Sequence, residues 1–97
     1  MRLPPSHFEY HSLHVAAPFA QSARVDWARP LSPTERVRVR EHSCVCTYPM
    51  FEFCTLGGLW FVRQLISEDP KEIWESPRIR ARPARELWLQ IMTGQAR

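Results

Sequence analysis

The sequence predicts an α+β fold, in which a three- or four-stranded antiparallel sheet carries one C-terminal helix on one face. Residues 50–66 and residues 35–46 alternate between apolar and polar side chains, which is typical of half-buried strands. Residues 83–92 instead repeat apolar side chains at helical spacing. We expect these elements to form a single domain over residues 34–97, preceded by an irregular, proline-containing N-terminal arm at residues 1–33.

The stretch MFEFCTLGGLWFVRQLI, residues 50–66, predicts a β-hairpin whose turn is Gly57-Gly58. Two-residue hairpin turns need positive φ angles, which glycine adopts at little cost. This turn sets Glu52 opposite Arg63, and opposite charges facing each other across a ladder contribute about 0.2–1 kcal/mol. A slip of one residue would lose the match, so the ion pair supports this register.

The alternating stretch ERVRVREHSCVC, residues 35–46, predicts the strand that precedes the hairpin. Its valines share one face, which we expect to join the core: Val37, Val39 and Val45. A three-residue connection at residues 47–49 would place Cys44 opposite Glu52. The arginines and cysteines would then lie on the opposite, outward face.

Between the hairpin and the helix, residues 72–76 fit either a short fourth strand or part of a helical turn. Asp69 and Pro70 are suited to cap and begin such a turn, and Pro77 ends either element. We favour the strand, because a fourth strand shields the edge of the sheet better than three strands do.

The final helix is predicted to begin at Pro83, with Gly94 just past its end. Its apolar positions fall at i, i+3, i+4, i+7 and i+8, and we expect them to pack on the valine face of the sheet: Ala84, Leu87, Trp88, Ile91 and Met92. In the N-terminal arm, Ser6 and Glu9 match a capping box and predict a short helix. Trp27 is expected to dock the arm on the domain.

Composition and charge set the expected compartment. The formal charge is +3, and no run of about 18 apolar residues is present, so we expect no membrane-spanning helix. The first residues lack the apolar centre of a secretion signal. A cytoplasmic protein with reduced thiols at Cys44, Cys46 and Cys54 is therefore expected.

One histidine and three cysteines form the sharpest cluster of ligand-type residues: His42, Cys44, Cys46 and Cys54. Nitrogen and sulfur ligands suit zinc, but sulfurs bound to one zinc ion lie about 3.8 Å apart. Same-face residues of a strand lie about 6.6–6.8 Å apart. We therefore expect no cofactor and thiols that pack as small hydrophobes. Zinc on these four residues and a redox-responsive pair of Cys44 and Cys54 are the alternatives.

Two further sets of residues could carry chemistry. Imidazoles suit transition metals, and a second cluster lies in the arm: His7, Glu9, His11 and His14. We expect these side chains to be solvated, because an irregular arm does not preorganise a site. A thiol, a base and a carboxylate are available as Cys54, His42 and Glu52, but no oxyanion site or nucleotide-binding motif accompanies them. We expect no enzyme.

Several motifs lie between residues 36 and 97: His42-x-Cys44-x-Cys46, Phe51-Glu52-Phe53-Cys54, Gly57-Gly58-Leu59-Trp60-Phe61-Val62-Arg63, Glu86-Leu87-Trp88 and Gly94-Gln95-Ala96-Arg97. With these motifs, roughly residues 36–97 resemble a group of small uncharacterised proteins from actinobacteria. No activity is known for this group, so the resemblance implies a bacterial, cytoplasmic origin and carries no functional residue.

We expect a small non-catalytic interaction or regulatory module that binds a protein partner or a second copy of itself. One short helix cannot cover both faces of the sheet, and exposed apolar patches commonly mark a partner surface. The apolar residues opposite the helix are Met50, Leu56, Leu59, Phe61 and Leu65. The alternative is nucleic-acid binding through an arginine-rich sheet face and the run before the helix. Its candidates are Arg36, Arg38, Arg40, Arg63, Arg78, Arg80, Arg82 and Arg85.

Overall fold

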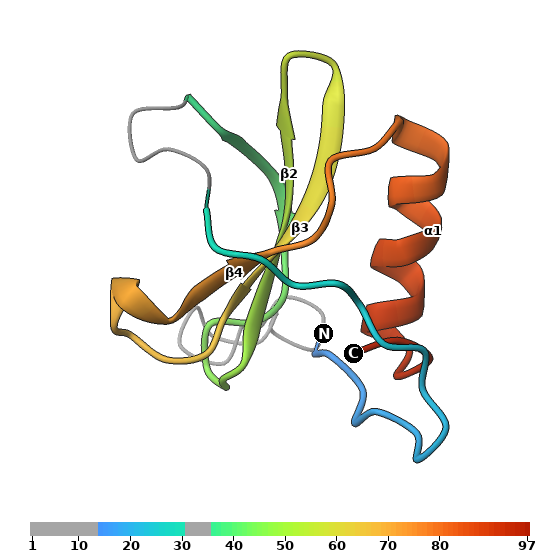
Figure 1. Ribbon diagram of the computed structural model, residues 1–97. Coiled ribbons are helices and arrows are strands. Elements are labelled where there is room, and N and C mark those ends of the chain that lie inside the picture. The colour runs from blue at the N-terminus through green and yellow to red at the C-terminus, as the bar shows by residue number, and fades with distance from the viewer. Residues whose placement is uncertain (1–13, 31–35) are drawn as a thin grey trace, which may run out of the picture.

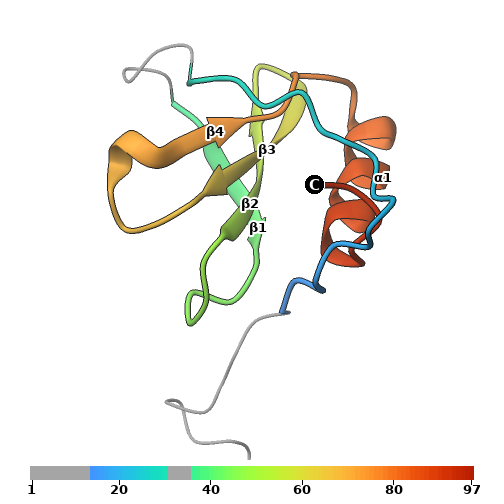
Figure 2. The same ribbon diagram turned by 60° about the horizontal axis from the view of Figure 1, so that its bottom comes forward.

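The computed structural model describes residues 14–30 and 36–97, and it contains a four-stranded antiparallel sheet with one helix on one side (Figures 1 and 2). The elements are β1 (Arg38–His42), β2 (Met50–Leu56), β3 (Leu59–Leu65), a 3-10 turn (Pro70–Glu72), β4 (Ile73–Glu75) and α1 (Ala81–Met92). The strands neighbour one another in sequence order. The predicted α+β class is confirmed.

The β2–β3 hairpin has the predicted register over its full length. Its pairs run from Met50 opposite Leu65 to Leu56 opposite Leu59. The two turn glycines have φ angles of +58° and +82°, as a two-residue hairpin turn with two left-handed residues requires. Glu52 faces Arg63 with an N–O distance of 3.3 Å.

β1 is shorter than the sequence predicts, because the backbone leaves the ladder after His42. The peptide N–H of Ser43 donates to the carbonyl of Phe51 at 2.8 Å, and the Ser43 hydroxyl accepts from the N–H of Phe51 at 2.8 Å. A serine that binds the backbone in this way competes with continued strand pairing. Residues 43–49 therefore form a loop, and the residue opposite Glu52 is His42 rather than Cys44.

The prediction that the valines join the core is wrong. A bulge between Val39 and Glu41 shifts the register, so Val39 lies opposite Cys54 on the face away from α1. Val39 is 43% exposed, and Val45 in the loop is 64% exposed. Since side chains alternate along a strand, the extra residue exchanges the faces of Arg38 and Val39, whereas Glu41 and His42 after the bulge keep theirs. Arg38, opposite Thr55, now lies on the same side of the sheet as α1.

Residues 69–75 contain both elements that the sequence left open. Asp69 caps the 3-10 turn, because its carboxylate accepts from the N–H of Lys71 at 2.9 Å. β4 follows directly and pairs with β3, with Glu75 opposite Arg63. The favoured strand is confirmed, and the helical turn precedes it.

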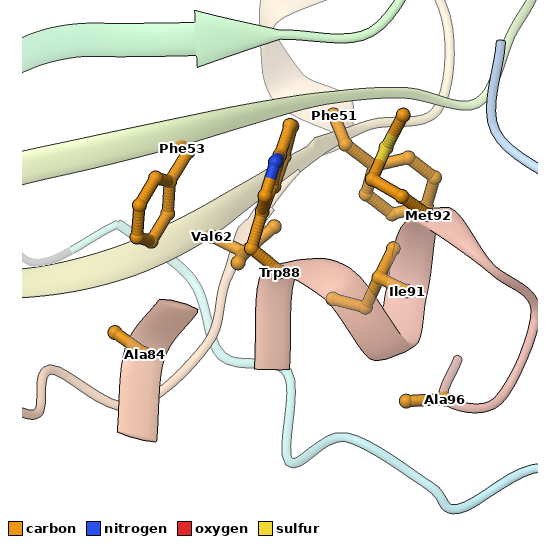
Figure 3. Close-up of a cluster of buried hydrophobic side chains, with 8 residues drawn as sticks. All are labelled: Phe51, Phe53, Val62, Ala84, Trp88, Ile91, Met92 and Ala96. Carbon is orange, nitrogen blue, oxygen red and sulfur yellow. The ribbon is translucent and has the colours of Figure 1, made fainter. Parts of the chain in front are cut away.

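The main core lies between α1 and the β2–β3 hairpin (Figure 3). Its buried members are Phe51, Phe53, Val62, Ala84, Trp88, Ile91, Met92 and Ala96, and Leu87 packs against them. Trp88 projects from α1 toward the strands, and its ring stacks on Phe53 with centroids 5.5 Å apart. The predicted apolar stripe is therefore confirmed, although the helix begins at Ala81, two residues before Pro83.

Residues 14–30 run alongside α1 without forming a helix or strand of their own (Figure 2). The N–H of Ala16 donates to the carbonyl of Met92 at 2.9 Å, and the N–H of Arg97 donates to the carbonyl of Ala23 at 2.8 Å. Trp27 packs against the core, 6.2 Å from the ring of Phe51, as the sequence predicts. The capping box at Ser6 lies outside the described residues.

Candidate functional site

The loop at residues 43–49 brings Cys44 and Cys46 together. Their sulfur atoms are 3.0 Å apart, and the peptide N–H of Cys46 donates to the sulfur of Cys44 at 3.5 Å. Cys44 is buried, whereas Cys46 is exposed. The spacing of about 6.6–6.8 Å between same-face residues holds only within a strand. Cys44 and Cys46 lie in a loop, so this spacing does not keep their sulfurs apart.

His14 of the N-terminal segment completes this cluster. Its Nε2 atom lies 3.8 Å from the sulfur of Cys46, and the three ligand atoms of His14, Cys44 and Cys46 lie within 4.8 Å of one another. We call these three residues the Cys2His cluster. The other members of the predicted histidine cluster, His7, Glu9 and His11, lie outside the described residues.

Two residues of the alternative zinc set lie elsewhere. His42 is exposed at the end of β1, and its Nδ1 atom is 2.8 Å from the carbonyl of Ser43. Cys54 is fully buried in β2. The thiol beside Cys44 is Cys46, rather than the Cys54 expected for a redox pair.

The two thiols of the Cys2His cluster lie within hydrogen-bond distance, with their sulfur atoms 3.0 Å apart. The hydrogen bond between them raises the pKa of Cys46 above its ordinary value. Near neutral pH the side chain of Cys46 is therefore a thiol, which is a weaker nucleophile than a thiolate.

A pocket of about 380 Å³ adjoins the cluster. The segment at residues 14–18 forms one wall, with His14 at its start, and residues 47–49 form another. Phe51 and Ile91 line it from the core. The pocket exists because the arm, the loop and the end of α1 meet here.

The thiol of Cys54 and the carboxylate of Glu52 do not form an activated nucleophile. Burial raises the pKa of the Cys54 thiol to about 12, so this thiol stays protonated at physiological pH. Glu52 forms an ion pair with Arg63. Neither side chain is arranged to generate a thiolate.

The raised pKa of Cys54 predicts a loss of stability at alkaline pH. An unfolded thiol titrates near pH 8.5, whereas the folded thiol titrates near 12. The protonated Cys54 thiol therefore contributes fully to the free energy of unfolding below about pH 8.5. This contribution is lost as pH rises toward 12, by up to about 1.4 kcal/mol per pH unit. We expect the free energy of urea unfolding to fall between pH 8 and pH 10 less steeply in Cys54→Ala than in the unmodified chain. Equal slopes would contradict this expectation.

The arginines proposed for nucleic-acid binding do not form one exposed face. Arg63 lies between Glu52 and Glu75, at 3.3 and 3.4 Å, and Arg78 also contacts Glu75, at 3.3 Å. Glu75 is buried, so these pairs neutralise a carboxylate inside the fold.

The other six arginines proposed for nucleic-acid binding are exposed: Arg36, Arg38, Arg40, Arg80, Arg82 and Arg85. Two of them contact side chains of the sheet. Arg85 pairs with Glu41 and covers the ring of Phe53 at 4.8 Å. The guanidinium of Arg40 lies 5.7 Å from the ring centre of Trp60.

The predicted partner surface is smaller than the sequence suggests. Met50 and Phe61 are buried, so they are not available to a partner. Arg78 covers the ring of Phe61 at 4.7 Å. Leu59 is 41% exposed, and Leu56 and Leu65 are half-buried.

Within residues 14–30 and 36–97, no helix is both long and apolar enough to cross a membrane. The chain matches no known protein-family model, no curated protein and no solved structure.

Proposed function

We propose that this chain is a small non-catalytic interaction module of the cytoplasm that binds a protein partner along β1. The sheet order leaves β1 at one edge. At the other edge, the backbone of Ala28 exchanges two hydrogen bonds with Glu75 of β4, at 2.8 and 2.7 Å. Among residues 14–30 and 36–97, β1 therefore offers the more open edge, and an exposed edge is where an extended segment of a partner adds as a further strand.

The observation that carries this proposal is an apolar patch beside that edge. Val39 shares the face away from α1 with Leu56 and Leu59, and we call these three residues the β1 patch. Val39 and Leu59 are 43% and 41% exposed. A strand of the partner that pairs with β1 would cover Val39, and the part of the partner that lies over the same face of the sheet would cover Leu56 and Leu59.

The charge on β1 indicates the chemistry of the partner. Arg38 and Arg40 flank Val39 and are exposed. Arginine forms planar, bidentate contacts with carboxylates, so a segment that alternates apolar and acidic residues would match both features. The same charges disfavour unspecific pairing between two copies of β1.

To test the proposal, a photo-crosslinking residue replaces Leu59 in the full chain. The variant is expressed in cells that naturally make this protein, so that its partner is present. The matched control places the same residue at Leu89, which is 53% exposed on α1. We expect one specific adduct from position 59 and none from position 89. The purified partner should then bind Val39→Asp about 30-fold more weakly, as for loss of a hot spot of about 2 kcal/mol, and Leu89→Asp with unchanged affinity.

Two outcomes would contradict this proposal. One is a protein that stays monomeric in light scattering and gives the same adducts from both positions. The other is nucleic acid as the bound species, which remains the alternative because several exposed arginines lie on β1 and at the start of α1. In that case affinity for a single-stranded probe falls with salt, and Arg38→Ala with Arg40→Ala reduces the slope of log K against log salt by about 0.7 per lost contact.

A further inference from the structure

We propose that His14, Cys44 and Cys46, the Cys2His cluster, form a zinc site that joins the N-terminal segment to the loop between β1 and β2. Two thiolates and one imidazole are a ligand set that zinc takes in proteins. His14 lies 32 residues from Cys46 along the chain, and the two meet only because the arm folds back on the domain. The site differs from the set that the sequence suggested, because His14 takes the place of His42 and Cys54.

The geometry of the cluster is close to that of a tetrahedral site. With Zn–S near 2.3 Å and Zn–N near 2.0–2.1 Å, two bound sulfurs lie about 3.8 Å apart and a sulfur and a nitrogen about 3.5 Å apart. The cluster has a sulfur–sulfur distance of 3.0 Å and a Cys46–His14 distance of 3.8 Å. The ion would be admitted by opening the thiol pair by less than about 1 Å and by bringing the His14 nitrogen, which lies within 4.8 Å of both sulfurs, closer to them. Cys46 is exposed and has room to make this movement.

The backbone holds the cluster from both sides. Two residues after His14, the N–H of Ala16 donates to the carbonyl of Met92 at 2.9 Å. One residue before Cys44, Ser43 binds the backbone of Phe51 through its N–H and its hydroxyl, both at 2.8 Å. Since Met92 and Phe51 belong to the main core, the positions of both halves of the site are coupled to that core.

Three protein ligands leave one coordination position for a water molecule, as in zinc sites that keep an open position. His14 and Cys46 are exposed, so solvent reaches the ion from their side. His14 also lines the 380 Å³ pocket. A small ligand in that pocket would therefore lie next to the metal.

A zinc site explains the cluster better than a disulfide between Cys44 and Cys46 does. A disulfide uses the two sulfurs alone and gives the neighbouring imidazole no role. Zinc uses all three side chains. The two possibilities also differ in their requirements, because a disulfide needs an oxidant and zinc binding needs both thiols reduced.

The proposal is tested with the full chain, metal-free and kept reduced with a phosphine. Cobalt(II) serves as the spectroscopic probe, and zinc affinity is measured by competition with a chromogenic chelator. We expect one zinc ion per chain and, with cobalt, a thiolate charge-transfer band with the intense visible bands of tetrahedral coordination. Cys46→Ser and His14→Ala should each weaken zinc binding at least 10-fold. Losing a residue that only supports a metal ligand already weakens metal binding about 10- to 100-fold, and these two residues are ligands themselves.

His42→Ala is the matched control, because it removes an exposed imidazole near the same loop that lies outside the cluster. It should leave zinc affinity and the cobalt spectrum unchanged. Cys44 is buried, so the test depends on the exposed residues Cys46 and His14, and circular dichroism verifies that each variant is folded. Absence of zinc binding in the unmodified chain, equal binding in all variants, or loss of binding in His42→Ala would each overturn the proposal.

Discussion

A Trp88→Ala variant is expected to lose about 3–5 kcal/mol of its free energy of unfolding. Trp88 is 2% exposed and stacks on Phe53 at the centre of the main core. Its removal leaves a cavity that the β2–β3 hairpin on one side and α1 on the other cannot close by small shifts. Single domains have only about 5–15 kcal/mol of total stability, so a large share of it is lost.

Urea unfolding followed by far-ultraviolet circular dichroism measures this loss. The matched control is Leu89→Ala, which truncates the next residue of the same helix, where the side chain is 53% exposed. We expect the control to change the free energy of unfolding by no more than about 0.5 kcal/mol. Similar losses in the two variants would show that α1 does not pack as described.

Gly94→Ala is expected to cost about 2–5 kcal/mol of the free energy of unfolding by combining two effects. Gly94 has a φ angle of +82°, and a left-handed conformation costs a residue with a Cβ about 1–2 kcal/mol. A Cβ there would also lie 2.4 Å from the carbonyl oxygen of Ala17, so the arm must move. That movement breaks the hydrogen bonds of Phe19 and Ser22 to the Gly94 carbonyl, at 2.8 and 2.6 Å, worth about 0.5–1.5 kcal/mol each.

Gly58→Ala separates the two effects. Gly58 has the same φ angle of +82°, but no atom lies within 4 Å of the position that its Cβ would take. We expect only the conformational cost of about 1–2 kcal/mol in this variant. Limited proteolysis should cut residues 14–30 faster in Gly94→Ala than in Gly58→Ala. An equal loss of stability and equal cleavage in both variants would contradict the described contact between the arm and Gly94.

The hairpin and the helix could be predicted because their signals are local. The Gly57-Gly58 turn and the opposed charges of Glu52 and Arg63 specify one register. The apolar positions of α1 specify the side that packs on the sheet. β1 could not be predicted in the same way. Its alternating pattern continues past His42, where the backbone leaves the sheet, and the bulge after Val39 exchanges the faces of the residues before it without changing that pattern.

The Cys2His cluster could not be predicted from local sequence patterns either. Reading residues 35–46 as one strand separated Cys44 from Cys46, whereas the loop brings them together. Nothing near His14 in the sequence indicates Cys46 as its neighbour. The contacts of the arginines are only partly local. The pairing of Arg63 with Glu52 could be predicted, but that of Arg85 with Glu41 depends on how α1 crosses the sheet.

The contacts between residues 14–30 and residues 92–97 have a consequence for the order of events during translation. The hairpin can form as soon as residues 50–65 have left the ribosome, since all its pairs are local. Residues 14–30 are made earlier, yet they find their hydrogen-bond partners only after α1 and the residues beyond it have emerged. Until then the apolar face of the hairpin lacks its cover, and the nascent chain is most exposed to aggregation in this interval.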